Sequence, residues 1–193
     1  LESQDPDGRT DQQSSHLGSM IVIEDISDEK RMKSTMSRYI DPSIADQLMS
    51  SENDIMGGQE TIATVLFSDV RSFTTITEAL GAQGTVTLLN EYFDIMVETI
   101  AEQGGVVDKF IGDAIMAGFG IPIAHEDDED RSVRAGINMI KRLWQWNLER
   151  EQKGQMPIDM GLGINTDRLV SGNIGSSKRM DYTMTVSYTH LTL

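Results

Sequence analysis

Two aspartates stand where apolar segments of the chain end, and together they could bind a metal ion. Asp69 follows the apolar run at residues 62–67. Asp113 comes directly after a glycine, in the turn between the apolar runs at 106–110 and 114–119. Hard cations such as Mg²⁺ need oxygen ligands, and proteins often hold them with one or two carboxylates plus the phosphates of a substrate. A single aspartate at a strand end is usually a turn residue, so a metal site is predicted only if the two carboxylates meet.

A long helix between the two aspartates must bring them together. Apolar residues recur at helical spacing from residue 76 to residue 100. Gly81 and Gly84 predict an interruption or kink in this helix, and the glycine pair at 104–105 predicts its end. The order strand, helix, strand, strand makes the first strand and the following hairpin neighbours in one sheet. We therefore expect both carboxylates at the same edge of that sheet.

The second half of the chain predicts one more helix and two more strands. The acidic run at 125–130 is interpreted as the first turn of a helix, which favours negative charge, rather than as a metal site. The two Trp of this helix are interpreted as core or interface packing. Its predicted apolar residues are Val133, Ile137, Ile140, Leu143, Trp144 and Leu148. Strands are predicted at 156–164 and 169–174, with a turn at 165–167 between them. The order predicts an α+β fold, a ferredoxin-like βαββαβ sandwich with the helices on one face.

Composition excludes several classes of function. The chain has 193 residues, 31 of them acidic and 16 basic, for a net charge of −15. This charge argues against general affinity for nucleic acid or for anionic membranes. There is no Cys, which excludes disulfides, a thiol nucleophile and a Cys-based zinc site. No apolar run approaches the roughly 18 residues of a membrane span. The cytoplasm is the expected location, although a membrane anchor could lie upstream of this sequence.

The turn at residues 70–74 could bind phosphate through backbone N–H groups, as turns between a strand and a helix do. The sequence contains neither GxxxxGK[ST] nor GxGxxG, so a P-loop and a Rossmann site are excluded. Because the turn directly follows Asp69, the predicted phosphate and metal sites adjoin.

Four short motifs follow one another at residues 67–74, 108–116, 161–166 and 171–176. They read Phe-Ser-Asp-Val-Arg-Ser-Phe-Thr, Asp-Lys-Phe-Ile-Gly-Asp-Ala-Ile-Met, Gly-Leu-Gly-Ile-Asn-Thr and Ser-Gly-Asn-Ile-Gly-Ser. In this order and at this spacing they resemble the catalytic domain of class III adenylate and guanylate cyclases, of the bacterial adenylate cyclase type. The resemblance covers residues 59–184 and implies the nucleotide cyclase fold.

This resemblance implies a two-metal site. Asp69 and Asp113 match the two catalytic, metal-binding aspartates, and the backbone carbonyl of Val70 matches a further metal ligand. Two Mg²⁺ ions, or Mn²⁺ in their place, would hold the triphosphate of ATP and activate the ribose 3′-hydroxyl for attack on the α-phosphorus. The products would be 3′,5′-cyclic AMP and pyrophosphate, which implies a role in signal transduction.

The resemblance also implies which residues bind the rest of the nucleotide. The phosphates would be bound by the backbone amides of Arg71, Ser72, Phe73 and Thr74. Lys109 matches the position that selects adenine, where guanylate cyclases carry Glu. Thr183 matches the second purine-reading position, where adenylate cyclases carry Asp or Thr. In this family the metal aspartates and the base-reading residues of one site come from two chains. A homodimer with two equivalent sites and a nearly inactive monomer are therefore expected.

The two ends of the chain are expected to lie outside the catalytic domain. Residues 1–27 resemble the end of a PAS or GAF sensor domain, and residues 28–58 resemble the helical transmitter that joins such sensors to cyclases. Residues 185–193 resemble a translated sequencing adapter and are expected to be a non-native tail. The family's last strands, and its Asn and Arg that orient the ribose and stabilise charge on the phosphate, are then missing. The fragment itself is expected to be inactive or nearly so.

Three other functions stay open from the sequence. A guanylate cyclase would share the fold and the metals, but Lys109 and Thr183 disfavour GTP. A non-catalytic nucleotide-binding or dimerisation module often loses a metal carboxylate, whereas both aspartates are intact here. A diguanylate cyclase carries a Gly-Gly-Asp/Glu-Glu-Phe turn, and the corresponding turn in this chain reads Ile-Gly-Asp-Ala.

Overall fold

The computed structural model describes residues 25–26, 30–31, 44, 57–176 and 178–185. The chain divides into two units, residues 1–36 and 37–193. The expected end of a sensor domain at 1–27, the expected helical transmitter at 28–58 and the expected tail at 185–193 lie largely outside the described residues. The elements that follow all belong to the second unit.

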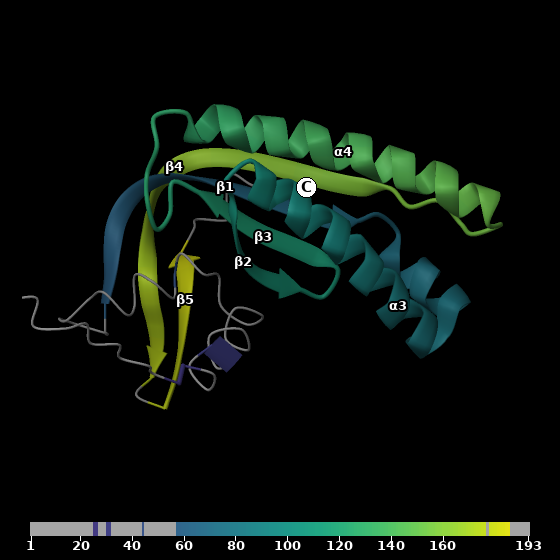
Figure 1. The fold of residues 1–193 in the computed structure, drawn as a ribbon, viewed down its shortest axis with the longest axis horizontal. Coiled ribbons are helices and arrows are strands. Elements are labelled where there is room, and N and C mark those ends of the chain that lie inside the picture. Colours follow the sequence, from purple (N-terminus) through teal and green to yellow (C-terminus); the bar gives the residue numbers. More distant parts are fainter. Residues whose placement is uncertain (1–24, 27–29, 32–43, 45–56, 177, 186–193) are drawn as a thin grey trace, which may run out of the picture. The chain divides into compact units, whose positions relative to one another are not determined.

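A sheet of five antiparallel strands carries the predicted site residues (Figure 1). The strands are β1 (Gly57–Val70), β2 (Val106–Ile111), β3 (Ala114–Phe119), β4 (Met160–Ser176) and β5 (Arg179–Thr185). Their order in the sheet is β2-β3-β1-β4-β5, and each neighbouring pair is antiparallel. Together with the helices α3 (Phe73–Glu102) and α4 (Asp128–Gln152), the chain order confirms the predicted α+β arrangement βαββαβ, with β5 added at its end.

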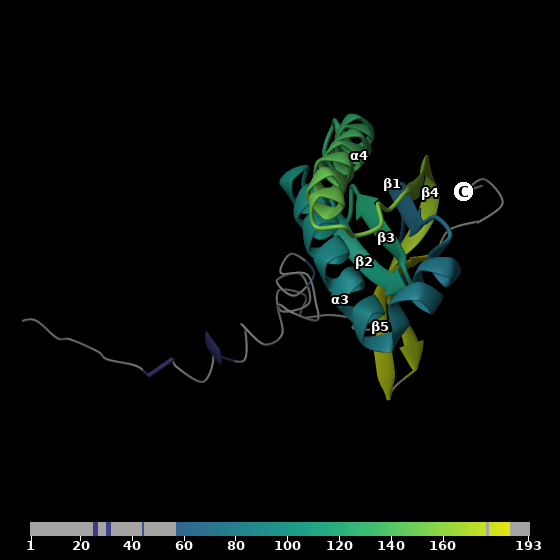
Figure 2. The same cartoon turned by 90° about the vertical axis from the view of Figure 1, so that its right-hand side faces the viewer.

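Both helices cover one face of the sheet, as predicted (Figure 2), and residues 63–68 of strand β1 are buried on both of its faces. Leu66 lies in the cluster that the strands form with α3 and α4. The neighbouring side chains Val65 and Phe67 point to the opposite face, where they pack with Met116 and Leu169. Alternation along a strand therefore feeds two apolar clusters, which fixes the direction of β1 and with it the position of Asp69 at its end.

Helix α3 has the predicted kink and the predicted end. Gly81 interrupts it with φ 67° and ψ 177°, backbone angles that a residue with a side chain rarely adopts. The helix ends at Glu102, and Gly104 follows with φ 70° while its N–H donates to the carbonyl of Ala101 (2.8 Å). No helix in the described part of the chain has the length and apolar content that crossing a membrane requires.

Strand β4 differs from the prediction of two strands and a turn at 165–167. It is one continuous strand that pairs with β1 from Val70 opposite Met160 to Gly57 opposite Asn173. Because β1 itself runs for 14 residues, it offers a ladder long enough to override the turn preference of the Asn-Thr-Asp sequence. Residues 156–159 are not in a strand.

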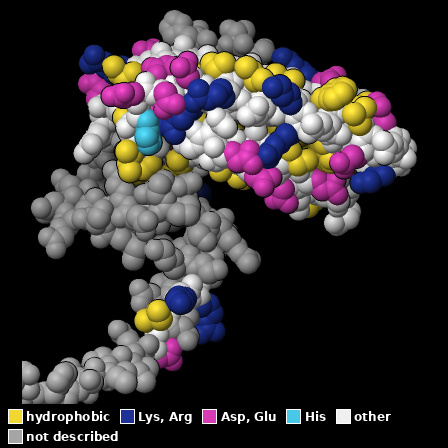
Figure 3. All heavy atoms as spheres, turned by 45° about the horizontal axis from the view of Figure 1, so that its top comes forward, with side chains coloured by type: hydrophobic (Ala, Val, Ile, Leu, Met, Phe, Trp, Pro, Cys, Tyr) yellow, Lys and Arg dark blue, Asp and Glu magenta, His cyan; other side chains and the backbone are white. Residues whose placement is uncertain are grey.

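Helix α4 is present where predicted, but most of its expected apolar face points to solvent. Among the six predicted residues only Leu143 is buried, whereas Trp144 is 64% exposed, and Figure 3 shows hydrophobic side chains along this outer surface. The buried side carries the small residues Ser132, Ala135 and Gly136 beside the larger Met139 and Leu143, and at Gly136 the helix lies close to β4. A Cβ atom added at Gly136 would come within 3.1 Å of Leu162. The other Trp of this helix, Trp146, packs against the core.

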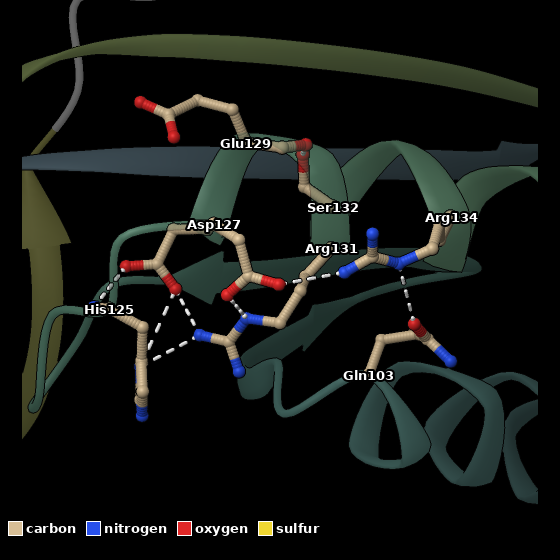
Figure 4. A network of polar contacts seen from close by, with 8 residues as sticks. Gln103, His125, Asp127, Glu129, Arg131, Ser132 and Arg134 are labelled. Atoms are coloured by element: carbon tan, nitrogen blue, oxygen red, sulfur yellow. Dashed lines mark hydrogen bonds and ion pairs between the residues drawn. The ribbon is translucent and has the colours of Figure 1, made fainter.

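The acidic run before α4 forms the predicted first helical turn and takes part in a charge network (Figure 4). Asp128 accepts a hydrogen bond from the backbone N–H of His125 (2.7 Å) and pairs with Arg131. Arg134 contacts Asp127 (2.9 Å) and donates to the side chain of Gln103 at the end of α3 (3.3 Å). These contacts join the start of α4 to the end of α3, so they account for the acidic run without a metal ion.

Candidate active site

The two aspartates lie close together where strand β1 ends and strand β3 begins. Asp69 lies near the end of β1, and Asp113 lies in the tight turn between β2 and β3, next to Gly112 with φ 65°. Strands β1 and β3 pair side by side up to Ser68 opposite Ile115. The backbone N–H of Val70 donates to Oδ2 of Asp113 (3.0 Å), so the second carboxylate is held against the strand that carries the first.

The Asp69 carboxylate has one oxygen that the protein leaves unsatisfied. Its Oδ1 atom is buried and has no hydrogen-bond partner among the described residues. Gly161 stands opposite Asp69 in β4, and a Cβ atom added there would lie 2.6 Å from this oxygen and 2.6 Å from Nη2 of Arg71. Because glycine has no Cβ atom, the Asp69 carboxylate and the Arg71 guanidinium can lie against β4 here, which accounts physically for the first glycine of the third sequence motif.

These residues fit a divalent cation that is also bound by a ligand. A buried carboxylate oxygen without a partner is costly, and a metal ion would satisfy it. The described residues hold no group of three or more His, Cys, Asp or Glu placed to bind a metal. A metal ion bound here would have two carboxylates of the protein as ligands, those of Asp69 and Asp113, and phosphate oxygens or water would complete its coordination shell.

A buried hydroxyl pair that sequence patterns did not predict lies behind the carboxylates. Tyr92 of α3 and Ser68 of β1 are both fully buried, and neither hydroxyl makes a hydrogen bond of good geometry in the described part of the chain. The pKa of Tyr92 is raised to about 12, mainly by burial. The nearby Ser68 hydroxyl lowers this pKa, and the charges of Asp113 and Asp69 raise it further. The phenol therefore stays neutral at physiological pH.

The turn after β1 presents backbone N–H groups beside the carboxylates. Ser72 has φ 55° and ψ 31°, a left-handed conformation that turns the chain sharply into α3. The first N–H groups of a helix have no acceptor within it, so those of Phe73 and Thr74 are placed to bind an anion. The N–H of Arg71 is not, because it already donates to the carbonyl of Asp159 (2.8 Å). The expected set of four phosphate-binding amides is therefore reduced by one in this arrangement.

The two predicted purine-reading residues also lie together, although their strands are at opposite edges of the sheet. Thr183 of β5 donates from Oγ1 to Oδ2 of Asp108 (2.8 Å), and Nζ of Lys109 lies 3.5 Å from the same oxygen. Burial raises the pKa of Asp108, while the contacts with Thr183 and Lys109 lower it. Sequence reasoning placed Lys109 and Thr183 in one role but did not identify the carboxylate that joins them.

Comparisons with known proteins agree with this geometry. Residues 58–189 match the adenylate and guanylate cyclase catalytic domain. An adenylate cyclase of Anabaena cylindrica is 36% identical over 125 residues, which are 63% of this chain and 24% of that protein. A solved guanylyl cyclase is 41% identical with a TM-score of 0.65, covering 68% of this chain and 67% of that chain. An adenylyl cyclase from P. aeruginosa is 36% identical with a TM-score of 0.65, covering 68% of each chain.

These matches are extensive enough to identify the family of the chain, but they cover only part of each curated relative. The chain spans between 18% and 29% of the curated relatives it matches. The match to the family covers far more than half of the 193 residues, and it includes both aspartates, Lys109 and Thr183. The chain belongs to the adenylate and guanylate cyclase catalytic domain family.

Proposed function

We propose that the protein is an adenylate cyclase that converts ATP to 3′,5′-cyclic AMP and pyrophosphate at a site shared by two copies of the chain. Two observations carry this proposal: the backbone N–H of Val70, next to Asp69, donates to the Asp113 carboxylate, and the buried Oδ1 of Asp69 has no partner in the described chain. Two Mg²⁺ or Mn²⁺ ions bound there would neutralise the triphosphate and favour ionisation of the ribose 3′-hydroxyl. In the balanced reaction, the 3′-oxygen bonds to the α-phosphorus, pyrophosphate leaves, and the hydroxyl proton passes to solvent.

The residues of this chain divide the work of binding. Asp69 and Asp113, with the backbone carbonyl of Val70, would hold the metal ions. The free N–H groups at the start of α3 would bind phosphate oxygens, and their partial positive charge favours the anionic ligand. Exclusion of water is aided by the apolar side chains that pack beneath this site.

The choice of ATP rests on Lys109 and Thr183. A Lys ammonium only donates hydrogen bonds, which suits the N1 acceptor of adenine and opposes the N1–H donor of guanine. In the proposed dimer these residues of one copy read the nucleotide that is held by the aspartates of the other. GTP is the rival substrate, because a solved guanylyl cyclase is 41% identical to this chain. A non-catalytic nucleotide-binding or dimerisation module is the second rival.

Regions outside the catalytic domain have proposed roles that rest on the sequence alone. Residues 1–27 would end a PAS or GAF sensor domain, and residues 28–58 would transmit its signal to the dimer in the cytoplasm. Residues 184–193 do not match the family's pattern of a ribose-orienting Asn and a phosphate-binding Arg. We therefore propose that the 193-residue chain by itself has little or no activity, since loss of one such transition-state group typically costs about 10²–10³ in rate.

The test is product analysis with the protein at its full natural length. ATP and GTP are supplied separately with Mg²⁺ or Mn²⁺, and cyclic products are identified by mass spectrometry. Cyclic AMP is expected as the main product, and sedimentation should show a dimer. Cyclic GMP as the main product would support the rival substrate, the absence of any cyclic product would support the non-catalytic module, and a fully active monomer would overturn the shared site.

A further inference from the structure

Asp108 occupies an irregular position in strand β2. The pairing register of β2 with β3 shifts between Val107 and Lys109, so Asp108 is an extra residue in its strand. Such bulges re-aim side chains and are common beside active sites. Here the bulge places a carboxylate where it reaches Thr183 on β5, the strand at the far edge of the sheet.

The three side chains at this corner differ sharply in exposure. The Asp108 side chain is 2% exposed, whereas that of Lys109 is 40% exposed. Oδ2 of Asp108 accepts the Thr183 hydroxyl proton at 2.8 Å and lies 3.5 Å from the Lys109 ammonium. A buried carboxylate thus contacts a half-buried hydroxyl and a more exposed ammonium.

We propose that Asp108 is a positioning residue that sets the choice of purine by fixing the direction of the Thr183 hydroxyl. This inference rests on the proposed function of Lys109 and Thr183 as purine-reading residues. A Thr hydroxyl has one donor and two acceptor sites. Because Asp108 as a carboxylate accepts that proton, the Thr183 oxygen can offer only an acceptor to a base.

The resulting pattern of one donor and one acceptor matches adenine and opposes guanine. Lys109 supplies a donor for N1 of adenine, and Thr183 supplies an acceptor for its N6 amino group. Guanine presents the reverse pattern, with a donor at N1 and an acceptor at O6. Without Asp108 as acceptor, the Thr183 hydroxyl can rotate and donate to O6, so discrimination at that position is lost.

The test compares Asp108→Asn with Asp181→Asn in the protein at its full natural length. The Asn side chain keeps the size of Asp but can donate to Thr183 Oγ1, which frees the hydroxyl proton. We expect the ratio of kcat/KM for ATP to that for GTP to fall about tenfold or more, the size typical of one specific base contact. Asp181 lies on β5, and its charge acts on Asp108. It makes no hydrogen bond with Thr183 among the described residues. Asp181→Asn should therefore change the ratio by less than about twofold.

A merely structural role would give a different result. If Asp108 only joined the two sheet edges, Asp108→Asn would lower the Tm and reduce both kcat/KM values together, and the unchanged ratio would overturn the inference. In a Thr183→Val background, Asp108→Asn should have no further effect on the ratio. A full additional effect there would also overturn it.

The unmodified protein provides a second measurement that does not depend on a variant folding. Protonated Asp108 donates a hydrogen bond and no longer has to accept one, so the ratio for ATP over GTP should fall as pH is lowered through the raised pKa of Asp108. The charged groups that face Asp108 are Lys109 of β2 and Asp181 of β5, and Asp181→Asn should keep this pH dependence. A ratio that does not change as the pH is lowered, while the protein stays folded, would contradict the inference.

The possible outcomes distinguish a failure of the role proposed for Asp108 from a failure of the proposed adenylate cyclase function. Strong production of cyclic AMP with an unchanged ratio in Asp108→Asn removes only the role of Asp108. Cyclic GMP as the main product of the unmodified protein, or no cyclic product from either nucleotide, removes the proposed function, and the inference falls with it.

Discussion

The proposed metal site, at Asp69 and Asp113, and the proposed purine-reading site, at Asp108, Lys109 and Thr183, each contain a carboxylate with a buried oxygen. The two carboxylates differ in their partners. At the first, Oδ1 of Asp69 has no partner among the described residues, and Gly161 leaves room for this carboxylate to lie against β4. At the second, Oδ2 of Asp108 has both a hydroxyl and an ammonium as neighbours. We propose that the first carboxylate binds a ligand, whereas the second positions other side chains. The same residue type would then serve either chemistry or positioning according to its partners.

The largest effect should come from Asp69→Asn. Losing one metal carboxylate should lower kcat by about 10³-fold or more, because metal ions stabilise much of the charge in the transition state. The Tm of the variant without ligand should be unchanged or higher, since an unsatisfied charge is removed. Stabilisation of the protein by Mn²⁺ and a non-hydrolysable ATP analogue should disappear in thermal melts.

Asp94→Asn is the matched control, because Asp94 is an exposed residue of α3. Activity and ligand-dependent Tm in this variant should stay within about twofold and about 1 °C of the unmodified protein. Full activity in Asp69→Asn would show that the two aspartates do not form a metal site.

Gly161→Ala should weaken the same site without changing any charge. The added methyl group would lie 2.6 Å from both the Asp69 carboxylate and the Arg71 guanidinium, so one of them must move. Because small displacements of binding groups are costly in catalysis, we expect kcat/KM for ATP to fall about 10²-fold. Steady-state kinetics measure this, and an Ala variant as active as the parent would mean that the close approach of Asp69 and Arg71 to β4 has no function.

Asp108→Ala should reverse the pattern of Asp69→Asn in stability. Truncation leaves the Thr183 hydroxyl and the Lys109 ammonium without their acceptor, so the free energy of unfolding should fall by about 1–3 kcal/mol. Urea denaturation provides the measurement. If Asp108→Ala and Asp69→Asn change stability by the same amount, the contrast between the two carboxylates is wrong.

The smallest effect is expected for Tyr92→Phe. The Tyr92 hydroxyl is buried without a partner of good geometry among the described residues, and removing an unsatisfied polar group costs little or stabilises slightly. We expect the free energy of unfolding to change by less than about 1 kcal/mol and kcat by less than about tenfold. A loss near that of a core cavity, about 3–5 kcal/mol, would show that this hydroxyl holds a structural hydrogen bond.

The sequence predicted the meeting of the two aspartates because chain order constrains sheet order. A strand, a helix and a hairpin of these lengths place β1 beside β3, whatever the details of packing. The kink at Gly81 and the helix end near Gly104 were also predicted, since glycines mark backbone angles that other residues avoid.

Three features depended on contacts between distant residues and were missed. Spacing along α4 could not show that Gly136 must face β4, which turns Trp144 and its apolar neighbours outward. The length of β1 determined that β4 continues through residues 165–167. The bulge at Asp108 has no local signal, because its partner Thr183 is 75 residues away along the chain.

The central claim is tested most directly by supplying ATP and GTP together, at equal concentration with Mn²⁺, to the protein at its full natural length. Mass spectrometry of the cyclic products should find cyclic AMP in large excess, and Asp69→Asn should abolish both products while Asp94→Asn keeps them. Cyclic GMP as the main product, or cyclic AMP formed equally well by Asp69→Asn, would contradict the account.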